Sequence, residues 1–178
     1  RQIYDFICRS KIGDNTVTLS AVVYIFIVLC AYFYSEIFSG RGAFTQLGVM
    51  IGTIMVANVA MVIIPGQKKV VNALIKGNKP DPIHGIRAKQ RSLHNNYLTL
   101  PVIFVMLAGH YPMVFATKFS WLILAIVIVI GALIRHFFNS RHAKKKTPWW
   151  TWVLSTILIV FIIYLSNTGC LLYTSDAA

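Results

Sequence analysis

The chain has 178 residues, of which 57% are hydrophobic and 12% are charged, and its 17 lysines and arginines stand against only 5 acidic residues. This balance argues against an ordinary soluble domain and indicates a chain whose main solvent is lipid. The net charge of +12 does not indicate a nucleic-acid partner, because the cations lie between long apolar runs and are not spread over a polar fold.

Five apolar segments are long enough to cross a hydrocarbon core of about 30 Å, which takes about 20 helical residues. They lie at about residues 17–38, 44–64, 97–116, 119–138 and 149–166. None has the polar face that a helix needs against water. The sequence therefore predicts an all-α integral membrane protein, a bundle of about five transmembrane helices that forms one polytopic domain over residues 1–169.

The tail Cys170–Ala178 follows the last apolar segment without a cap or an amphipathic pattern. It resembles the in-frame translation of a sequencing adapter, so we exclude residues 170–178 from the expected fold. The remaining cysteines, Cys8 and Cys30, have no spacing typical of a disulfide framework or a zinc site. The chain contains no Cys-x-x-Cys-His motif for haem attachment.

The cations predict an orientation. All lysines and arginines except Arg41 and Lys118 fall before the first segment, in the loop of residues 65–96, or at the fourth junction, from Arg135 near the end of the fourth segment onward. Because cytoplasmic loops carry an excess of cations, we expect residue 1 in the cytoplasm and residue 169 in the periplasm of a bacterial inner membrane.

The second apolar segment contains small residues, Gly48, Gly52 and Ala60, at multiples of four residues, which favours close packing against another helix. Packing within one bundle is the simpler interpretation, and a dimer interface is the alternative. Asn58 lies deep in the same segment, where an amide needs a partner, so we expect it to form hydrogen bonds between helices.

The loop of residues 65–96 begins with Val70, Val71, Leu74 and Ile75, which share one helix face flanked by lysines. This pattern predicts an amphipathic interfacial helix on an anionic leaflet, in a long cytoplasmic loop. The glycine, asparagine and prolines of residues 77–82 predict a break after it.

Polar and basic side chains then crowd the start of the third segment and the end of the fourth. Arginine suits a planar oxyanion, because its guanidinium forms a flat fork of donors. A solvated collar explains the same cations without any ligand. The candidate substrate-binding residues are Arg87, Gln90, Arg91, Asn95 and Arg135.

Three histidines lie in or beside the apolar segments. His94 and His136 are expected at the same membrane face, where they could pair, and His110 lies about 24 Å further along its helix. A neutral imidazole can ligate haem or metal, or carry a proton, without bringing a charge into lipid. The alternative is a histidine hydrogen-bonded at the interface.

Five separated blocks suggest a family. The chain carries YDFICRS at residues 4–10, NVAMVIIPGQKK at 58–69, KQRSLHNNYLTLP at 89–101, GHYPM at 109–113 and LIRHFFN at 133–139. Together they resemble the membrane domain of the bacterial membrane-bound urate oxidases, over nearly all of residues 1–169.

This resemblance implies an inner-membrane oxidoreductase that converts urate toward allantoin in purine degradation and passes electrons to a c-type cytochrome domain or another respiratory acceptor. It implies a haem c in a C-terminal domain and about three upstream helices beyond these 178 residues. The fragment alone is then expected to be inactive. The competing hypothesis is a non-enzymatic membrane module, either a transporter or an anchor for a separate catalytic domain.

Overall fold

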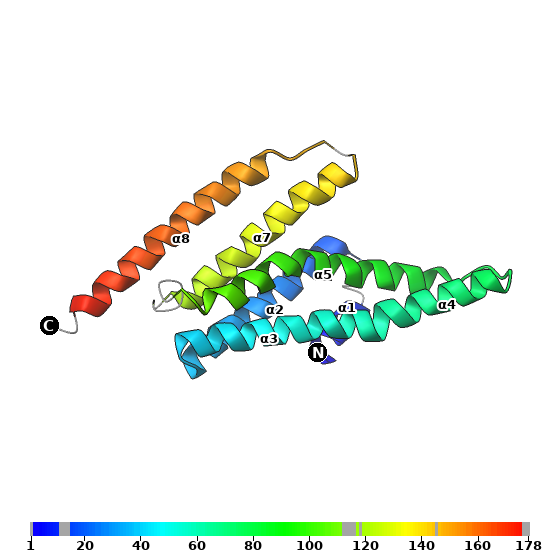
Figure 1. The fold of residues 1–178 in the computed structure, drawn as a ribbon, viewed down its shortest axis with the longest axis horizontal. Helices are drawn as coiled ribbons and strands as arrows, with labels where there is room; N and C mark the ends of the chain where they lie inside the picture. The colour runs from blue at the N-terminus through cyan, green and yellow to red at the C-terminus, as the bar shows by residue number, and fades with distance from the viewer. Residues whose placement is uncertain (1, 11–14, 112–116, 118, 145, 176–178) are drawn as a thin grey trace. The chain divides into compact units, whose positions relative to one another are not determined.

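The computed structural model describes residues 2–10, 15–111, 117, 119–144 and 146–175, with side chains described for all of these except residues 9 and 168–175. The elements in this part of the chain are helices (Figure 1). They are α1 Gln2–Arg9, α2 Thr16–Ile37, α3 Gly40–Asn58, η2 Val59–Ile63, α4 Ile64–Ile75, α5 Pro82–Ala108, α7 Ser120–His142 and α8 Trp150–Ser175. The all-α fold class is thus confirmed.

Within the described residues, four helices are long and apolar enough to cross a membrane: Thr16–Ile37, Gly40–Ile75, Ser120–His142 and Trp150–Asn167. They correspond to the predicted segments 17–38, 44–64, 119–138 and 149–166. The remaining segment, 97–116, coincides with the second half of α5, and part of it lies outside the described residues. The fifth span therefore stays a prediction.

The amphipathic stretch of residues 70–75 is helical, but it does not begin a new helix. It belongs to α4, which continues α3 through the π-helical turn η2, so that the helix is continuous from Gly40 to Ile75. At 1.5 Å per residue this 36-residue helix is about 54 Å long, well beyond a hydrocarbon core of about 30 Å. The position of residues 70–75 on a leaflet stays a prediction.

The chain divides into two compact units. Unit 1 comprises Arg1–Tyr24 and Met50–Asn96, and unit 2 comprises Ile25–Val49 and Tyr97–Ala178. Each unit is described by itself below.

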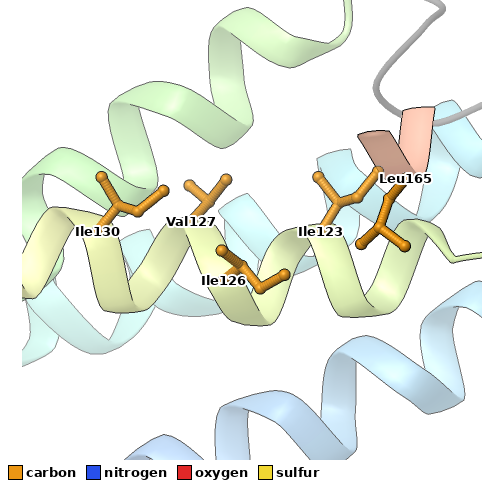
Figure 2. Packing of buried hydrophobic residues seen from close by; sticks show 5 residues of the cluster. All are labelled: Ile123, Ile126, Val127, Ile130 and Leu165. Atoms are coloured by element: carbon orange, nitrogen blue, oxygen red, sulfur yellow. The ribbon is translucent and has the colours of Figure 1, made fainter. Parts of the chain in front are cut away.

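In unit 2, α7 and α8 run antiparallel and pack together (Figure 1). Ile123, Ile126, Val127 and Ile130 follow the i, i+3, i+4, i+7 spacing of one helix face, and Figure 2 shows them with Leu165 of α8. Partly buried apolar side chains surround this cluster: Phe104, Leu122, Ile134, Leu158 and Ile162. The core of unit 2 is therefore apolar packing between helices, mostly aliphatic, with aromatic side chains such as Phe104 and the buried Phe137.

A very close helix contact in unit 2 involves a glycine. A Cβ at Gly131 of α7 would lie 2.7 Å from Cδ and 2.9 Å from Cγ of Pro101 in α5. The predicted small-residue stripe is confirmed only in part: a Cβ at Gly48 would lie 3.2 Å from Val105, whereas one at Gly52 would meet no described atom within 4 Å, and Ala60 is exposed.

In unit 1, α4 and α5 form an antiparallel hairpin (Figure 1). Gly77 adopts a φ of 70°, the left-handed conformation that ends many helices. Asp81 Oδ1 accepts a hydrogen bond of 2.9 Å from the Ile83 backbone N–H, and Pro82 occupies the first turn, so α5 begins with an N-cap and a proline. The predicted break at residues 77–82 is confirmed.

Candidate functional site

Unit 1 contains a cavity of about 240 Å³. This volume is below the range of about 300–1,000 Å³ typical for drug-sized ligands, so it suits a single small ring system. The wall residues come from α1, from the η2–α4 segment and from α5: Asp5, Cys8, Met61, Val62, Pro65, Gly66, Lys69, His84, Arg87, Gln90 and Arg91.

Helix α5 supplies the polar wall of the cavity. His84, Arg87 and Arg91 line the cavity at spacings of three and four residues, which places them along one helix face. Gly66 of α4 allows the two helices to approach, because a Cβ there would lie 3.3 Å from the His84 carbonyl oxygen. The close hairpin thus brings Lys69 of α4 into the same cavity.

The wall of the cavity carries a net positive charge. Lys69, Arg87 and Arg91 contribute cations, and Asp5 contributes the one carboxylate in this lining. Lys69 and Arg87 are exposed, whereas only 4% of the Arg91 side chain is exposed. A charge at this depth is far less screened than one at the surface, so the cavity favours an anionic ligand.

Arg91 is held in place on two sides. Its Nη2 donates to Asp5 Oδ1 at 2.6 Å, and its guanidinium carbon lies 4.8 Å from the centre of the Tyr4 ring. An ion pair and a cation–π contact together fix the plane of the guanidinium. The Nη1 atom is buried and has no hydrogen-bond partner among the described residues.

A buried polar cluster lies next to Arg91. The Tyr4 hydroxyl is 2.8 Å from His94 Nδ1, and Asn58 Nδ2 donates to the same hydroxyl at 3.1 Å. Asn58 Nδ2 also donates to Asn95 Oδ1 at 2.9 Å, and Asn95 Nδ2 donates to the Met55 carbonyl at 2.9 Å. The expected hydrogen bonds of Asn58 between helices are therefore confirmed.

The Tyr4 hydroxyl contacts both neighbours. Its oxygen accepts from Asn58 Nδ2, and its second lone pair or its hydrogen meets His94 Nδ1, according to the tautomer of the ring. His94 is 6% exposed, and its Nε2 atom is buried without a partner among the described residues.

Three titratable groups around Arg91 are neutral at neutral pH: the Tyr4 hydroxyl, the Cys8 thiol and the His94 ring. Burial raises the pKa of the Tyr4 hydroxyl to about 12, and it also raises the pKa of the Cys8 thiol. Burial, with a further contribution from the Arg91 charge, lowers the pKa of His94 to about 4. The charged groups at this end of the cavity are therefore Arg91 and Asp5.

The structure brings some of the candidate substrate-binding residues together. Arg87, Gln90 and Arg91 line the cavity of unit 1. Asn95 lies about one turn after Arg91 on α5 and accepts a hydrogen bond from Asn58. Arg135 belongs to unit 2, where its Nε atom is buried with no partner in the described part of the chain. That Arg135 binds the substrate together with the other four residues stays a prediction.

The candidate haem or metal ligands do not all belong to one unit of the chain. Within the described residues, no group of three or more histidine, cysteine, aspartate or glutamate side chains could hold a metal ion. His94 belongs to unit 1, whereas His136, which lies 3.3 Å from the Tyr97 hydroxyl, belongs to unit 2. His110 is exposed just beyond the end of α5. Pairing of His94 with His136 stays a prediction.

The sequence predicts three of the eleven wall residues, Arg87, Gln90 and Arg91. It does not single out Asp5, Lys69 or His84 as site residues, and it does not identify Tyr4 as a partner of Arg91. The i, i+4 spacing of Tyr4 and Cys8 on a short helix, both buried, is a signal that could have indicated a docked face. The hairpin turn at residues 77–81 could likewise have paired residues 65–69 with 84–91.

Comparison with known families agrees with the sequence blocks. The family model described as "Urate oxidase N-terminal" matches residues 1–166 of the chain. No curated protein and no solved structure matches it.

Proposed function

The chain belongs to the urate oxidase N-terminal family, and from this premise we propose that it is the membrane part of a urate-oxidising protein and that urate binds in the cavity of unit 1. The observation that carries the proposal is the cavity itself, in which a buried, rigidly held arginine and two further cations face a space suited to one small ring system. Urate is a planar anion at neutral pH, rich in carbonyl oxygens, and arginine binds such groups through its flat fork of donors.

The wider proposal follows the chemistry of urate oxidation. Urate loses two electrons and two protons, and water adds to the purine on the way to allantoin. The part of this chain is to bind and orient the anion: Arg91 is fixed by Asp5 and Tyr4, and Arg87 and Lys69 add charge at the cavity wall. A haem c, expected beyond these 178 residues, would accept the electrons one at a time.

The proposed location is a bacterial inner membrane, with residue 1 in the cytoplasm and residue 169 in the periplasm. It is supported by four helices long and apolar enough to cross a membrane, and by the cation distribution, in which all but two lysines and arginines fall in the segments expected on one side. A cavity lined by residues 61–91 would then face the cytoplasmic end of the membrane.

Calorimetric titration of urate into the purified chain in lipid nanodiscs tests the binding site. Arg87→Gln, which removes an exposed cavity cation, is expected to weaken binding about fivefold, the size of a partly screened charge contact. Arg141→Gln removes an exposed cation at the end of α7 and should leave binding unchanged. Equal affinities for the two variants would contradict the proposed site.

The transport alternative is distinguished by vesicles that contain the chain. If the proposal is correct, the vesicles bind urate without accumulating it against a gradient. Accumulation of unmodified urate inside the vesicles would instead favour a transporter.

A further inference from the structure

The turn between α7 and α8 carries exposed tryptophans and exposed cations that the proposed urate site does not use. We call residues 141–152 the α7–α8 turn. Both helices are long and apolar enough to cross a membrane, and they run antiparallel (Figure 1). The turn therefore lies at one membrane face, where its exposed side chains meet the headgroup region of the lipid.

Aromatic rings form the inner layer of this turn. The ring centre of the buried Phe137 lies 5.4 Å from that of Trp149 and 5.6 Å from that of Trp152. These contacts place the last turns of α7 level with the start of α8. Trp149, Trp150 and Trp152 are nevertheless 68%, 57% and 41% exposed. Because tryptophan rings collect where the hydrocarbon core meets the headgroups, this layer marks that boundary.

Cations form an outer layer. Arg141 follows Phe137 by four residues, which is about 6 Å along the axis of α7, and Lys144 and Lys146 follow the end of that helix. All three cations are exposed, and Lys145 lies outside the described residues. The headgroups add about 5–7 Å to each side of the hydrocarbon core. The outer layer is therefore at the depth of the lipid phosphates.

These cations have no carboxylate nearby to neutralise them. The sequence has no acidic residue from position 82 to position 175. In the described part of unit 2 the one acidic side chain is Glu36, one turn after Tyr32 on α2. Tyr32 packs against Trp121, with ring centres 5.7 Å apart, and Trp121 lies about 30 Å before Arg141 along α7. Glu36 is thus near the opposite end of α7, and the turn keeps its positive charge.

The two layers together match one kind of molecule. Topology alone accounts for cations in a cytoplasmic loop, and the interface alone accounts for tryptophans. A phospholipid offers a phosphate at the depth of the cations and apolar groups at the depth of the rings. An acidic soluble protein could reach the cations, but not rings that lie at the hydrocarbon boundary.

We propose that the α7–α8 turn is a binding site for an anionic phospholipid, in which Arg141, Lys144 and Lys146 contact the phosphate and the tryptophan rings contact the glycerol and the start of the acyl chains. A zwitterionic phospholipid carries the same phosphate together with an ammonium group that these cations repel, so the site selects lipids of net negative charge. This inference does not depend on the urate site, which belongs to unit 1.

The fluorescence of the turn's own tryptophans tests the proposal. The chain has four tryptophans, so Trp121→Phe leaves only the three in the turn. This chain is placed in bilayers that mix phosphatidylcholine and phosphatidylglycerol, with brominated acyl chains on one lipid or the other, because bromine quenches a tryptophan that it contacts. Each cation near an anionic lipid contributes about a fivefold preference. We therefore expect the brominated anionic lipid to bind at least about fivefold more tightly than the zwitterionic one.

Two variants of equal net charge locate the site, both made in the Trp121→Phe chain. Lys144→Gln/Lys146→Gln removes two cations of the turn and should lower the preference to below about twofold. The matched control is Lys79→Gln/Lys89→Gln, which removes two exposed cations from unit 1 and should keep the preference. All four positions are exposed, and circular dichroism establishes that each variant is folded.

The outcomes separate a site from a general attraction of a basic protein to anionic lipid. Equal quenching by the two brominated lipids in the Trp121→Phe chain overturns the proposal. An equal loss of preference in both double variants also overturns it, since the net charge of the chain would then be the cause. Raising the salt from about 0.05 M to about 0.5 M should weaken the preference, because the cations are exposed. A preference that salt does not change would contradict the role of the cations.

Discussion

The two units of this chain bury different chemistry. Unit 2 packs mainly apolar side chains, such as Ile123 and Leu165, and its buried polar side chains include the hydroxyls of Thr151 and Ser155. Gly131 contacts Pro101 in the same unit. Unit 1 buries a connected polar cluster in which Arg91 and His94 are each at most 6% exposed. Aliphatic packing accepts many substitutions of similar volume, whereas a polar cluster requires every partner. We therefore expect substitutions in the buried cluster of unit 1 mainly to impair function, and substitutions in the core of unit 2 mainly to impair packing of the helices.

The largest expected effect is in unit 1. Asp5→Ala leaves the Arg91 charge buried without its carboxylate, and breaking a buried pair in this way costs about 3–5 kcal/mol. Because Asp5 itself is 22% exposed, we expect a loss of about 3 kcal/mol in the free energy of unfolding, measured by denaturant titration in mixed micelles. A loss below 1 kcal/mol would show that water reaches Arg91.

The corresponding test in unit 2 is Gly131→Ala. The new methyl group would meet ring atoms of Pro101 at 2.7 and 2.9 Å, and a proline ring cannot rotate away, so we expect destabilisation of about 2–3 kcal/mol by the same titration. Gly52→Ala is the matched control, since its Cβ would meet no described atom within 4 Å. That variant should be stabilised by up to about 1 kcal/mol, because alanine favours the helix.

Acidification should destabilise the chain through a buried group of unit 1, the His94 ring. The pKa of His94 is lowered to about 4 in the folded chain from 6.5, so the unfolded chain binds more protons between these values and folding weakens as the pH falls. We expect the free energy of unfolding to decrease by about 2 kcal/mol between pH 7 and pH 5 on account of this group. In His94→Gln this part of the pH dependence should vanish, and its persistence would assign it to other groups.

The smallest effect sharpens the distinction between buried and exposed polar contacts. Asp81→Ala makes the same type of substitution as Asp5→Ala, but it removes the carboxylate of an exposed N-cap, which accepts a hydrogen bond of 2.9 Å from the Ile83 N–H. We expect a loss of about 1 kcal/mol. Equal destabilisation of the two aspartate variants would show that burial of Arg91 adds nothing to the cost of losing its carboxylate.

The sequence predicted the helices better than the site. Apolar length predicted the ends of α2 and α7 to within about four residues. The second helix instead continues to Ile75, and α8 continues to Ser175, into the tail that was excluded from the expected fold. The glycine and prolines of residues 77–82 located the hairpin turn. These features depend on local composition, which a single sequence shows directly.

The second span was predicted to end at Ile64, yet the helix continues to Ile75. In η2 the Ile64 N–H bonds to the Val59 carbonyl, five residues back, and Pro65 falls in the first turn of α4, where its missing N–H costs little. The pattern of residues does not reveal such a change in hydrogen bonding.

The cavity could not be predicted in full for a different reason. Arg87, Gln90 and Arg91 stood out by their density, but Asp5 and Tyr4 act through contacts with residues about 90 positions away. Only the docking of α1 onto α5 makes them part of the site, and periodicity within α1 does not specify the partner of its buried face.

The π turn between α3 and α4 has a consequence for insertions and deletions. One π turn holds a residue more than the α-helix around it needs, as an inserted residue would. Deleting Val59 or Ala60, which do not line the cavity as Met61 and Val62 do, would convert the turn to ordinary α-helix and leave Asn58 and Gly66 on the faces they now occupy. The same deletion within α7 would rotate every later side chain by about 100°. This helix therefore contains one dispensable position, flanked by residues that the cavity and its polar cluster require.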